Sequence, residues 1–145
     1  MTTSSTRLRR TVAAAALLTL GCLAVGPSAF GAGEDAGAQV RPVLSEKLPN
    51  VPGESLTAVV VSYAPGGRSP AHHHAGSVFA YVLSGAIRSE NSATGPAKVY
   101  KAGESFFEPP GSEHLVSENA SATEPASLLA VFVADDGAVL KSADE

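Results

Sequence analysis

From residue 40 onwards, short apolar runs alternate with clusters of glycine, proline, serine and asparagine. Apolar runs of this length, bounded by turn-forming residues, are typical of β-strands. We predict strands within residues 55–64, 77–85, 86–90, 97–103, 104–108, 113–119 and 126–134. No segment in this part repeats apolar residues with the helical spacing i, i+3, i+4, i+7. The predicted fold class is therefore all-β, a sandwich or barrel, in one domain over residues 40–145.

Alternate residues of a strand point to opposite faces. In the segment SVFAYVLSG we expect one set of side chains to line the interior, namely Val78, Ala80 and Val82. The other set is expected to pack on the opposite side: Phe79, Tyr81 and Leu83. Two further aromatics are expected in the core, Phe106 and Phe107.

The first 32 residues differ from the rest of the chain. Three arginines precede an uncharged apolar run at residues 11–25, and small residues broken by Pro27 follow. This order is typical of a secretory signal peptide, and the apolar run is shorter than the roughly 20 residues that span a membrane. We predict a cleaved signal peptide over residues 1–32, a flexible leader over residues 33–39, and a secreted or periplasmic domain.

The route of export stays open at this point. The pair Arg9 and Arg10 matches part of a twin-arginine signal, and the general secretory (Sec) route is the alternative. Cys22 could be a lipoprotein cleavage site, but Thr19 fits poorly three residues before it and the apolar run continues beyond it. Lipidation is therefore the weaker hypothesis.

Removal of a signal peptide that carries three arginines and no acid lowers the formal net charge from −4 to −7. An acidic chain without a basic cluster is not expected to bind nucleic acid or to insert stably into an anionic membrane. Cys22 is the only cysteine, so the mature domain has no disulfide. Its stability must come from the core and from any bound ion.

Three consecutive histidines, His72, His73 and His74, precede the strand at residues 77–85. On an extended chain His72 and His74 share one face, which is the arrangement of a His-x-His metal pincer, and His73 faces the other way. His114 is the fourth and last histidine, just after a Pro-Pro-Gly turn, and is the candidate third ligand. Imidazole suits zinc, copper, iron and nickel. The alternative is a solvated surface cluster.

The segment around His72 and His74 and the segment around His114 resemble the first and second conserved motifs of the cupin family, respectively. The first motif is matched by Gly66, His72, His74 and Gly85. The second is matched by Gly103, Pro109, Gly111 and His114, with Asn119 one residue late and Glu118 at the expected asparagine position. The resemblance implies a double-stranded β-helix, or jelly-roll barrel, with a metal inside it held by His72, His74 and His114. It also suggests a homodimer.

One departure from the first motif affects the proposed ligands. The family's glutamate ligand corresponds to Val78, which cannot bind a metal and would instead line the pocket. Three interpretations follow: a neutral three-histidine site, a substitute carboxylate from Glu108, or a barrel that binds metal weakly or not at all. Glu108 could serve as a fourth ligand or orient a bound water, whereas Glu113, next to His114, should face away.

The function implied by the resemblance is that of a small exported metal-binding cupin. We expect an oxidoreductase of the dioxygenase type acting on a small molecule, because some cupins hold ferrous iron with three histidines. Fe(II) is the favoured ion, with Mn, Ni, Zn or Cu as alternatives. The competing hypotheses are a non-enzymatic small-ligand or metal-binding cupin and a cupin isomerase that uses Glu108 as its base.

Overall fold

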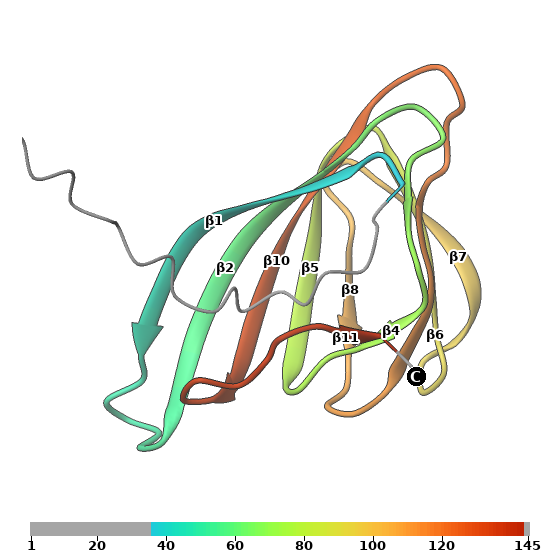
Figure 1. Ribbon diagram of the computed structural model, residues 1–145. Coiled ribbons are helices and arrows are strands. Elements are labelled where there is room, and N and C mark those ends of the chain that lie inside the picture. The colour runs from blue at the N-terminus through green and yellow to red at the C-terminus, as the bar shows by residue number, and fades with distance from the viewer. Residues whose placement is uncertain (1–35, 144–145) are drawn as a thin grey trace, which may run out of the picture.

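The computed structural model describes residues 36–143, which form eleven β-strands and no helix (Figure 1). The strands are β1 (Ala38–Lys47), β2 (Glu54–Tyr63), β3 (Arg68–Ser69), β4 (His72–His73), β5 (Ser77–Ser84), β6 (Ala86–Asn91), β7 (Gly95–Lys101), β8 (Ser105–Glu108), β9 (Glu113–Asn119), β10 (Ala126–Asp135) and β11 (Ser142–Ala143). The predicted all-β class is confirmed. The predicted signal peptide, residues 1–32, lies outside the described residues, which contain no helix long and apolar enough to cross a membrane.

The strands form two sheets that enclose the interior of a barrel (Figure 1). The five-stranded sheet has the order β1-β2-β10-β5-β8. The six-stranded sheet has the order β11-β4-β9-β6-β7 together with β3, which pairs with β9. The strand pairs are antiparallel, and neighbours such as β2 and β10 are far apart in sequence, as in a jelly roll.

The chain passes from one sheet to the other at Gly85, between β5 and β6. This residue has φ 68°, and a Cβ there would lie 2.7 Å from the carbonyl oxygen of Pro125. Glycine is required because it tolerates this conformation and leaves room for the neighbouring backbone.

The core lies on the inner face of the five-stranded sheet. Val59 of β2 pairs with Ala130 of β10, which in turn pairs with Ala80 of β5, and all three side chains are buried. The fully buried side chains of this core include Val59, Val78, Val82 and Ile87. Burial of each such side chain stabilises the fold by about 1.5–3 kcal/mol.

The predicted alternation along β5 is confirmed for the inner set, Val78, Ala80 and Val82. The outer set, Phe79, Tyr81 and Leu83, does lie on the opposite face but remains exposed. Phe106 is partly buried against the core, as expected. The prediction for Phe107 is wrong, because it pairs with Phe79 on the outer face and is 51% exposed. Adjacent residues of one strand cannot both face inward.

The strand β1 has no counterpart among the predicted strands. It begins at Ala38, inside the segment expected to be a leader, and pairs with β2 along the edge of the sheet. Its register shifts between Pro42 and Leu44, and most of its side chains are exposed. Proline and bulges are common in edge strands, where alternation of apolar and polar residues is weak, so the sequence pattern did not reveal it.

The segment after β10 returns across the end of the barrel to the six-stranded sheet. It turns at Gly137, buries Leu140 in the core, and ends as β11, which pairs with β4. This return brings the C-terminal segment next to the histidine-bearing strand (Figure 1).

Candidate metal centre

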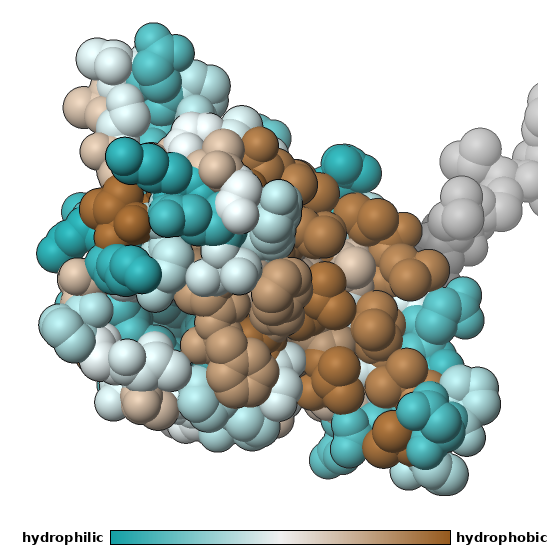
Figure 2. Space-filling view, turned by 180° about the vertical axis from the view of Figure 1, so that it is seen from behind, coloured by the Kyte–Doolittle hydropathy of each residue, from teal (hydrophilic) through white to brown (hydrophobic). Residues whose placement is uncertain are grey.

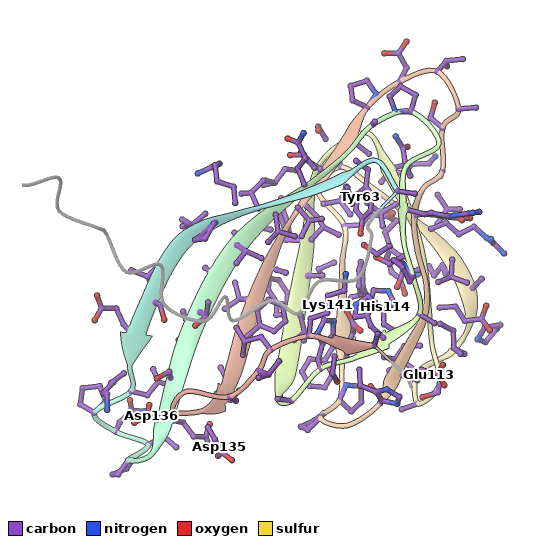
Figure 3. The ribbon with its side chains drawn as sticks, viewed as in Figure 1. Tyr63, Glu113, His114, Asp135, Asp136 and Lys141 are labelled. Atoms are coloured by element: carbon purple, nitrogen blue, oxygen red, sulfur yellow. The ribbon has the colours of Figure 1, made fainter. Side chains whose placement is uncertain are left out.

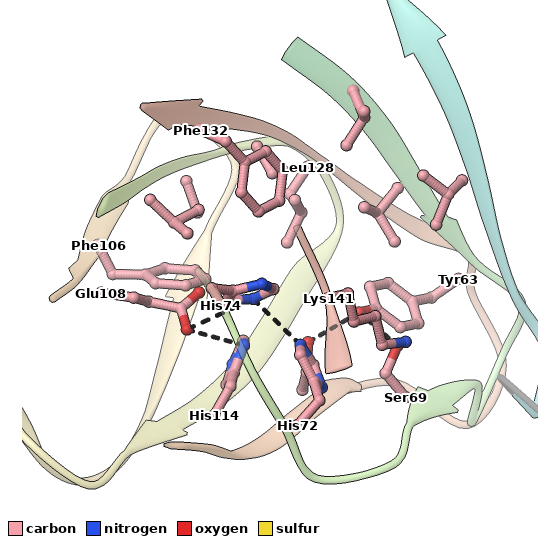
Figure 4. A pocket seen from close by; sticks show the side chains of 17 residues that line it. Tyr63, Ser69, His72, His74, Phe106, Glu108, His114, Leu128, Phe132 and Lys141 are labelled. Atoms are coloured by element: carbon pink, nitrogen blue, oxygen red, sulfur yellow. Dashed lines mark hydrogen bonds and ion pairs between the residues drawn. The ribbon is translucent and has the colours of Figure 1, made fainter. Parts of the chain in front are cut away.

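The three histidines predicted to act together are close to one another in the barrel interior. His72 lies on β4 and pairs directly with His114 on β9, and His74 follows β4. All three are buried, and one ring nitrogen from each lies within 4.8 Å of the others (Figure 4). His73 is half-buried and pairs with Glu113. The expected difference between His73 and its two neighbours is therefore present in the fold.

Backbone carbonyls hold His72 and His74 in one orientation. The Nδ1 atom of His72 donates to the carbonyl of Pro70 at 2.7 Å, and that of His74 donates to the carbonyl of Leu140 at 2.8 Å. The two Nε2 atoms are left 3.1 Å apart. With both rings neutral, two lone pairs face each other, and a shared cation would relieve their repulsion.

The separation of these atoms also suits an ion. Two ligand nitrogens at about 2.0–2.1 Å from one metal lie about 3 Å apart when cis to each other. A second hydrogen bond that fixes the free ring nitrogen is the usual support of a metal-binding histidine. The residues present therefore fit a divalent transition metal.

His114 has a partner at each ring nitrogen. Its Nε2 atom lies 2.9 Å from the Ser89 hydroxyl, and its Nδ1 atom lies 3.1 Å from Oε2 of Glu108. The same carboxylate oxygen lies 3.8 Å from Nε2 of His74. Glu108 thus reaches between two of the three histidines, and a metal bound by His114 would replace one of these two contacts.

Glu108 comes from the position directly opposite Val78. The two residues pair in the ladder between β5 and β8, and Val78 lines the pocket. Glu108 is only 2% exposed. Asn91 donates its amide to Oε2 of Glu108 at 3.3 Å and to the Ser112 hydroxyl at 2.9 Å. The carboxylate is therefore inside the pocket, on the neighbouring strand, and is oriented by Asn91.

Burial sets the protonation of the site. Burial, with a smaller contribution from the neighbouring His72, lowers the pKa of His74 to about 4 and that of His114 to about 3. Burial raises the pKa of Glu108 to about 7, against the opposing effect of its hydrogen bond from Asn91. His74 and His114 are therefore neutral near pH 7, which is the form that binds metals. The contact between His114 and Glu108 is then a hydrogen bond rather than an ion pair.

The pocket around the histidines has an apolar wall supplied by the five-stranded sheet (Figure 4). The apolar lining residues are Val40, Val59, Val61, Val78, Ala80, Phe106, Leu128, Ala130 and Phe132. The space open to the centre of a water molecule is about 50 Å³. One water needs about 10–15 Å³ by this measure, so the pocket suits a small molecule and excludes a polymer.

Glu113 lies on the outside of the barrel, whereas the neighbouring His114 points inward (Figure 3). A bulge in β9 at Leu115 shifts the register against β6 between Glu90 and Asn91. Because of this extra residue, Asn119 rather than Glu118 has its side chain buried on the inner side. The bulge accounts for the one-residue offset of Asn119 in the second motif.

Several lining and supporting residues were not predicted from the sequence, namely Tyr63, Ser69, Ser89, Asn91, Ser117 and Lys141. Tyr63 shares its face with Val59 and Val61, so alternation along β2 could have indicated it. Lys141 belongs to no motif, and only the return of the C-terminal segment brings it into the pocket.

Comparison with known families identifies the class of protein. The model of the cupin domain matches residues 59–132, which include all four histidines and parts of both sheets. The chain therefore belongs to the cupin family, as the two motifs predicted. No curated protein matches it.

Similar solved structures include an oxalate oxidase in complex with the substrate analogue glycolate, with 25% identity and a TM-score of 0.53. That match covers 67% of this chain, which spans about half (51%) of the oxalate oxidase. A cupin-like protein from Thermotoga maritima is 20% identical with a TM-score of 0.53, covering 70% of this chain and 77% of that one. The Schizosaccharomyces pombe Cnp3 cupin domain is 21% identical with a TM-score of 0.54, covering 68% and 65%. These last two show the fold alone.

Proposed function

We propose that the protein is a metal-binding cupin in which His72, His74 and His114 hold a divalent ion. The observation that carries this proposal is the convergence of two Nε2 atoms, 3.1 Å apart, in a buried pocket. Each of these two rings is already fixed through Nδ1 by a backbone carbonyl. Such an arrangement costs free energy through desolvation and lone-pair repulsion, and a bound cation offsets that cost.

The chemistry proposed for this site is that of a dioxygenase acting on a small molecule. A bound ion, with Fe(II) favoured over Mn, Ni, Zn or Cu, would act as a Lewis acid for a substrate with two oxygen donors and would promote its reaction with O₂. The chain's own part is to orient the ligands, to exclude water with the apolar wall, and to place Glu108 beside the histidines. The oxalate oxidase that shares the fold has been solved with glycolate, a small molecule with oxygen donors, which is consistent with this proposal.

Glu108 is proposed as a fourth ligand or as the group that orients a bound water. Its carboxylate lies 3.1 Å from His114 and 3.8 Å from His74, so it is within reach of an ion shared by these rings. Asn91 keeps the carboxylate turned toward the site. In this arrangement Glu108 would take the role of the glutamate that the first cupin motif has at the position of Val78.

Metal analysis of the purified protein, followed by oxygen uptake with a panel of small diketones, tests the proposal. We expect about one metal ion per chain after loading and dialysis, and oxygen consumption with at least one substrate. Metal content near zero after loading would contradict the metal site. Bound metal without oxygen uptake would contradict only the dioxygenase activity.

An acid–base activity, such as that of an isomerase, is the second candidate. It is favoured by the position of Glu108, the one acid among the described residues that line the pocket. A carboxylate held beside a small pocket and shielded from water can accept a proton from a bound substrate. Exchange of substrate protons with deuterated water, without O₂ consumption, would support this candidate. A metal-binding cupin with neither activity remains the third.

Self-association is proposed to use the outer face of the five-stranded sheet. Exposed Phe79 and Tyr81 of β5 lie beside Phe107 of β8, and β1 adds exposed Leu44 at the other edge. Figure 2 shows a broad hydrophobic surface on this side of the molecule. Large exposed apolar patches usually mark an interaction surface, and a second copy of the chain supplies a matching one.

Export of the protein remains a proposal that rests on residues 1–32 of the sequence. Expression of the full chain in a bacterial host, followed by N-terminal sequencing of the exported product, tests it. The expected N-terminus lies near residue 33, and retention of Met1 would contradict a cleaved signal peptide.

A further inference from the structure

The pocket has a second polar region besides the one formed by the histidines and Glu108. Tyr63 of β2 places its hydroxyl 2.8 Å from that of Ser117 on β9 and 3.4 Å from that of Ser69 on β3. Lys141 also lines the pocket. Figure 4 shows its side chain directed toward Tyr63 and Ser69, on the side of the histidines away from Glu108. The metal centre thus lies between an acidic side and a side with a cation and three hydroxyls.

The position of Lys141 is fixed by the backbone on both sides of it. The carbonyl of Leu140 accepts the hydrogen bond from His74, and Ser142 pairs with His73 in the ladder between β11 and β4. Lys141 is only 9% exposed. A lysine on an otherwise exposed C-terminal segment would normally extend into water. Here the same contacts that orient the metal-site histidine also hold a cationic side chain at the pocket.

We propose that Lys141, together with the hydroxyls of Tyr63 and Ser117, forms a subsite for the anionic group of a small substrate that the metal centre binds through its oxygen donors. The inference rests on the proposed metal site and adds to it the charge, size and orientation of the substrate. The substrate class is a compact organic anion, either a carboxylate or an enolate, with an apolar body facing the wall formed by β2 and β10.

The charges around the pocket favour an anion. A divalent ion and the Lys141 ammonium would both face the largely apolar cavity, in which Glu108 is the one acid among the described lining residues. One of the hydroxyls of Tyr63 and Ser117 donates to the other, which leaves one hydroxyl proton for a ligand. An ammonium group and that hydroxyl are suitable partners for carboxylate or enolate oxygen.

The apolar wall limits the rest of the molecule. Val61 and Leu128 pair with each other across β2 and β10, and both line the pocket. A space of about 50 Å³ suits a molecule of only a few heavy atoms. We therefore expect selection for small anions with a short hydrocarbon part and rejection of bulky or cationic ones.

Propionate and its neutral isostere propionamide are the probes of this subsite. The variant Lys141→Met keeps the length of the side chain and removes its charge, Lys141→Arg restores the charge, and Lys101→Met alters an exposed lysine as the matched control. Calorimetry on the Co(II)-loaded protein measures both ligands, and the Co(II) absorption spectrum measures metal binding separately.

We expect Lys141→Met to weaken propionate binding about 10- to 100-fold, the usual loss for a hydrogen bond to a charged group. Propionamide binding should stay the same and Co(II) affinity should not fall, because the loss of a nearby positive charge does not weaken cation binding. Lys141→Arg should recover part of the loss, and Lys101→Met should match the unaltered protein. Equal propionate affinity in Lys141→Met and the unaltered protein would overturn the inference, as would failure of the unaltered protein to bind propionate.

The same titration on chelator-treated protein separates this inference from the proposed metal site. Propionate binding should be weaker there but should still depend on Lys141. A protein that takes up no Co(II) contradicts the metal site, while the chelated samples still decide whether Lys141 binds anions. Thermal unfolding of each variant checks that the fold is intact.

Discussion

The inner faces of the two sheets present opposite chemistry to the same cavity. Apart from Ile87 of β6 and Tyr100 of β7, the six-stranded sheet contributes mainly polar side chains at its inward positions: Ser69, His72, Ser89, Asn91, His114, Ser117 and Asn119. The five-stranded sheet contributes mostly valine, alanine, leucine and phenylalanine. Glu108, at the end of β8, is the acidic exception on the apolar sheet. The six-stranded sheet therefore supplies most of the candidate ligands, and the five-stranded sheet supplies most of the hydrophobic core and shields the site.

The two sheets contribute to stability with opposite sign: burying polar groups costs free energy, and burying apolar groups stabilises the fold. Buried polar groups are costly unless they are hydrogen-bonded. Within the described residues every buried side-chain nitrogen or oxygen has a polar neighbour, but for the facing Nε2 atoms of His72 and His74 that neighbour is another lone pair. The polar side chains of the six-stranded sheet thus form a connected network, in which Asn91 donates a hydrogen bond to Glu108 and the Ser89 hydroxyl is hydrogen-bonded to His114. The apolar sheet supplies the burial that offsets the cost of this network.

Removing a ligand from the polar sheet should have the largest effect. The variant His114→Ala should abolish retention of metal, because the proposed site then keeps only the two histidines of the His-x-His pair. Elemental analysis of loaded and dialysed protein measures the loss. His73→Ala is the matched control, since His73 pairs with Glu113 and is directed away from the other histidines. Metal retained at full content in His114→Ala would show that the ligand set is wrong.

Truncation of a wall residue should affect stability more than metal binding. Phe132 of β10 is buried beside His74, with 5.2 Å between ring centroids, and Phe132→Ala should lower the free energy of unfolding by about 3–5 kcal/mol. Phe79, on the outer face next to Val131 in the ladder, is 45% exposed, and Phe79→Ala should cost less than about 1 kcal/mol. Urea unfolding of both variants makes the comparison. Equal losses would contradict the assignment of inner and outer faces.

A substitution of Glu108, the acidic residue on the mostly apolar five-stranded sheet, tests its role in metal binding. The variant Glu108→Gln keeps the size of the side chain but removes its negative charge, so metal affinity should fall about 10- to 100-fold. Competition with a chelating dye gives the affinity. Glu113→Gln is the control, because Glu113 lies beside His114 in sequence but on the outside of the barrel (Figure 3). An unchanged affinity in Glu108→Gln would exclude Glu108 both as ligand and as the group that orients bound water.

The sequence predicted the parts of the molecule that depend on local alternation and motif spacing. The inward faces of Val78 and Val82, and the opposite orientation of His73 and its neighbours, follow from a two-residue period. Glu108 is a candidate from the sequence alone, but its pairing with Val78 appears only once β5 and β8 are aligned. The strands were therefore more predictable than their register.

Features that depend on distant parts of the chain could not be predicted. Lys141 enters the pocket because the segment after β10 folds back onto β4, and no local pattern encodes that return. The exposed Phe107 looked like a core residue because hydrophobicity alone does not distinguish an inner face from an apolar outer face. The bulge at Leu115 inverts the alternation within β9 and places Asn119 on the inner side.

Substitutions on the outer face of the five-stranded sheet should have the smallest effect on the stability of the folded monomer. Phe79→Ser and Phe107→Ser together remove two exposed aromatics that pair across β5 and β8, where little packing energy is lost. If a second copy covers this face, the double variant should be a monomer at concentrations where the unaltered protein is a dimer, because buried aromatics dominate interface energies. Light scattering coupled to gel filtration gives the mass.

Val99→Ser is the control for this last comparison, since Val99 is also exposed and apolar but lies on β7 of the six-stranded sheet. It should leave the dimer intact. A dimer that survives the double variant but dissociates in Val99→Ser would place the interface on the other sheet. A monomeric unaltered protein would show that the apolar outer face is not a self-association surface, and the exposed aromatics would then require a different occupant.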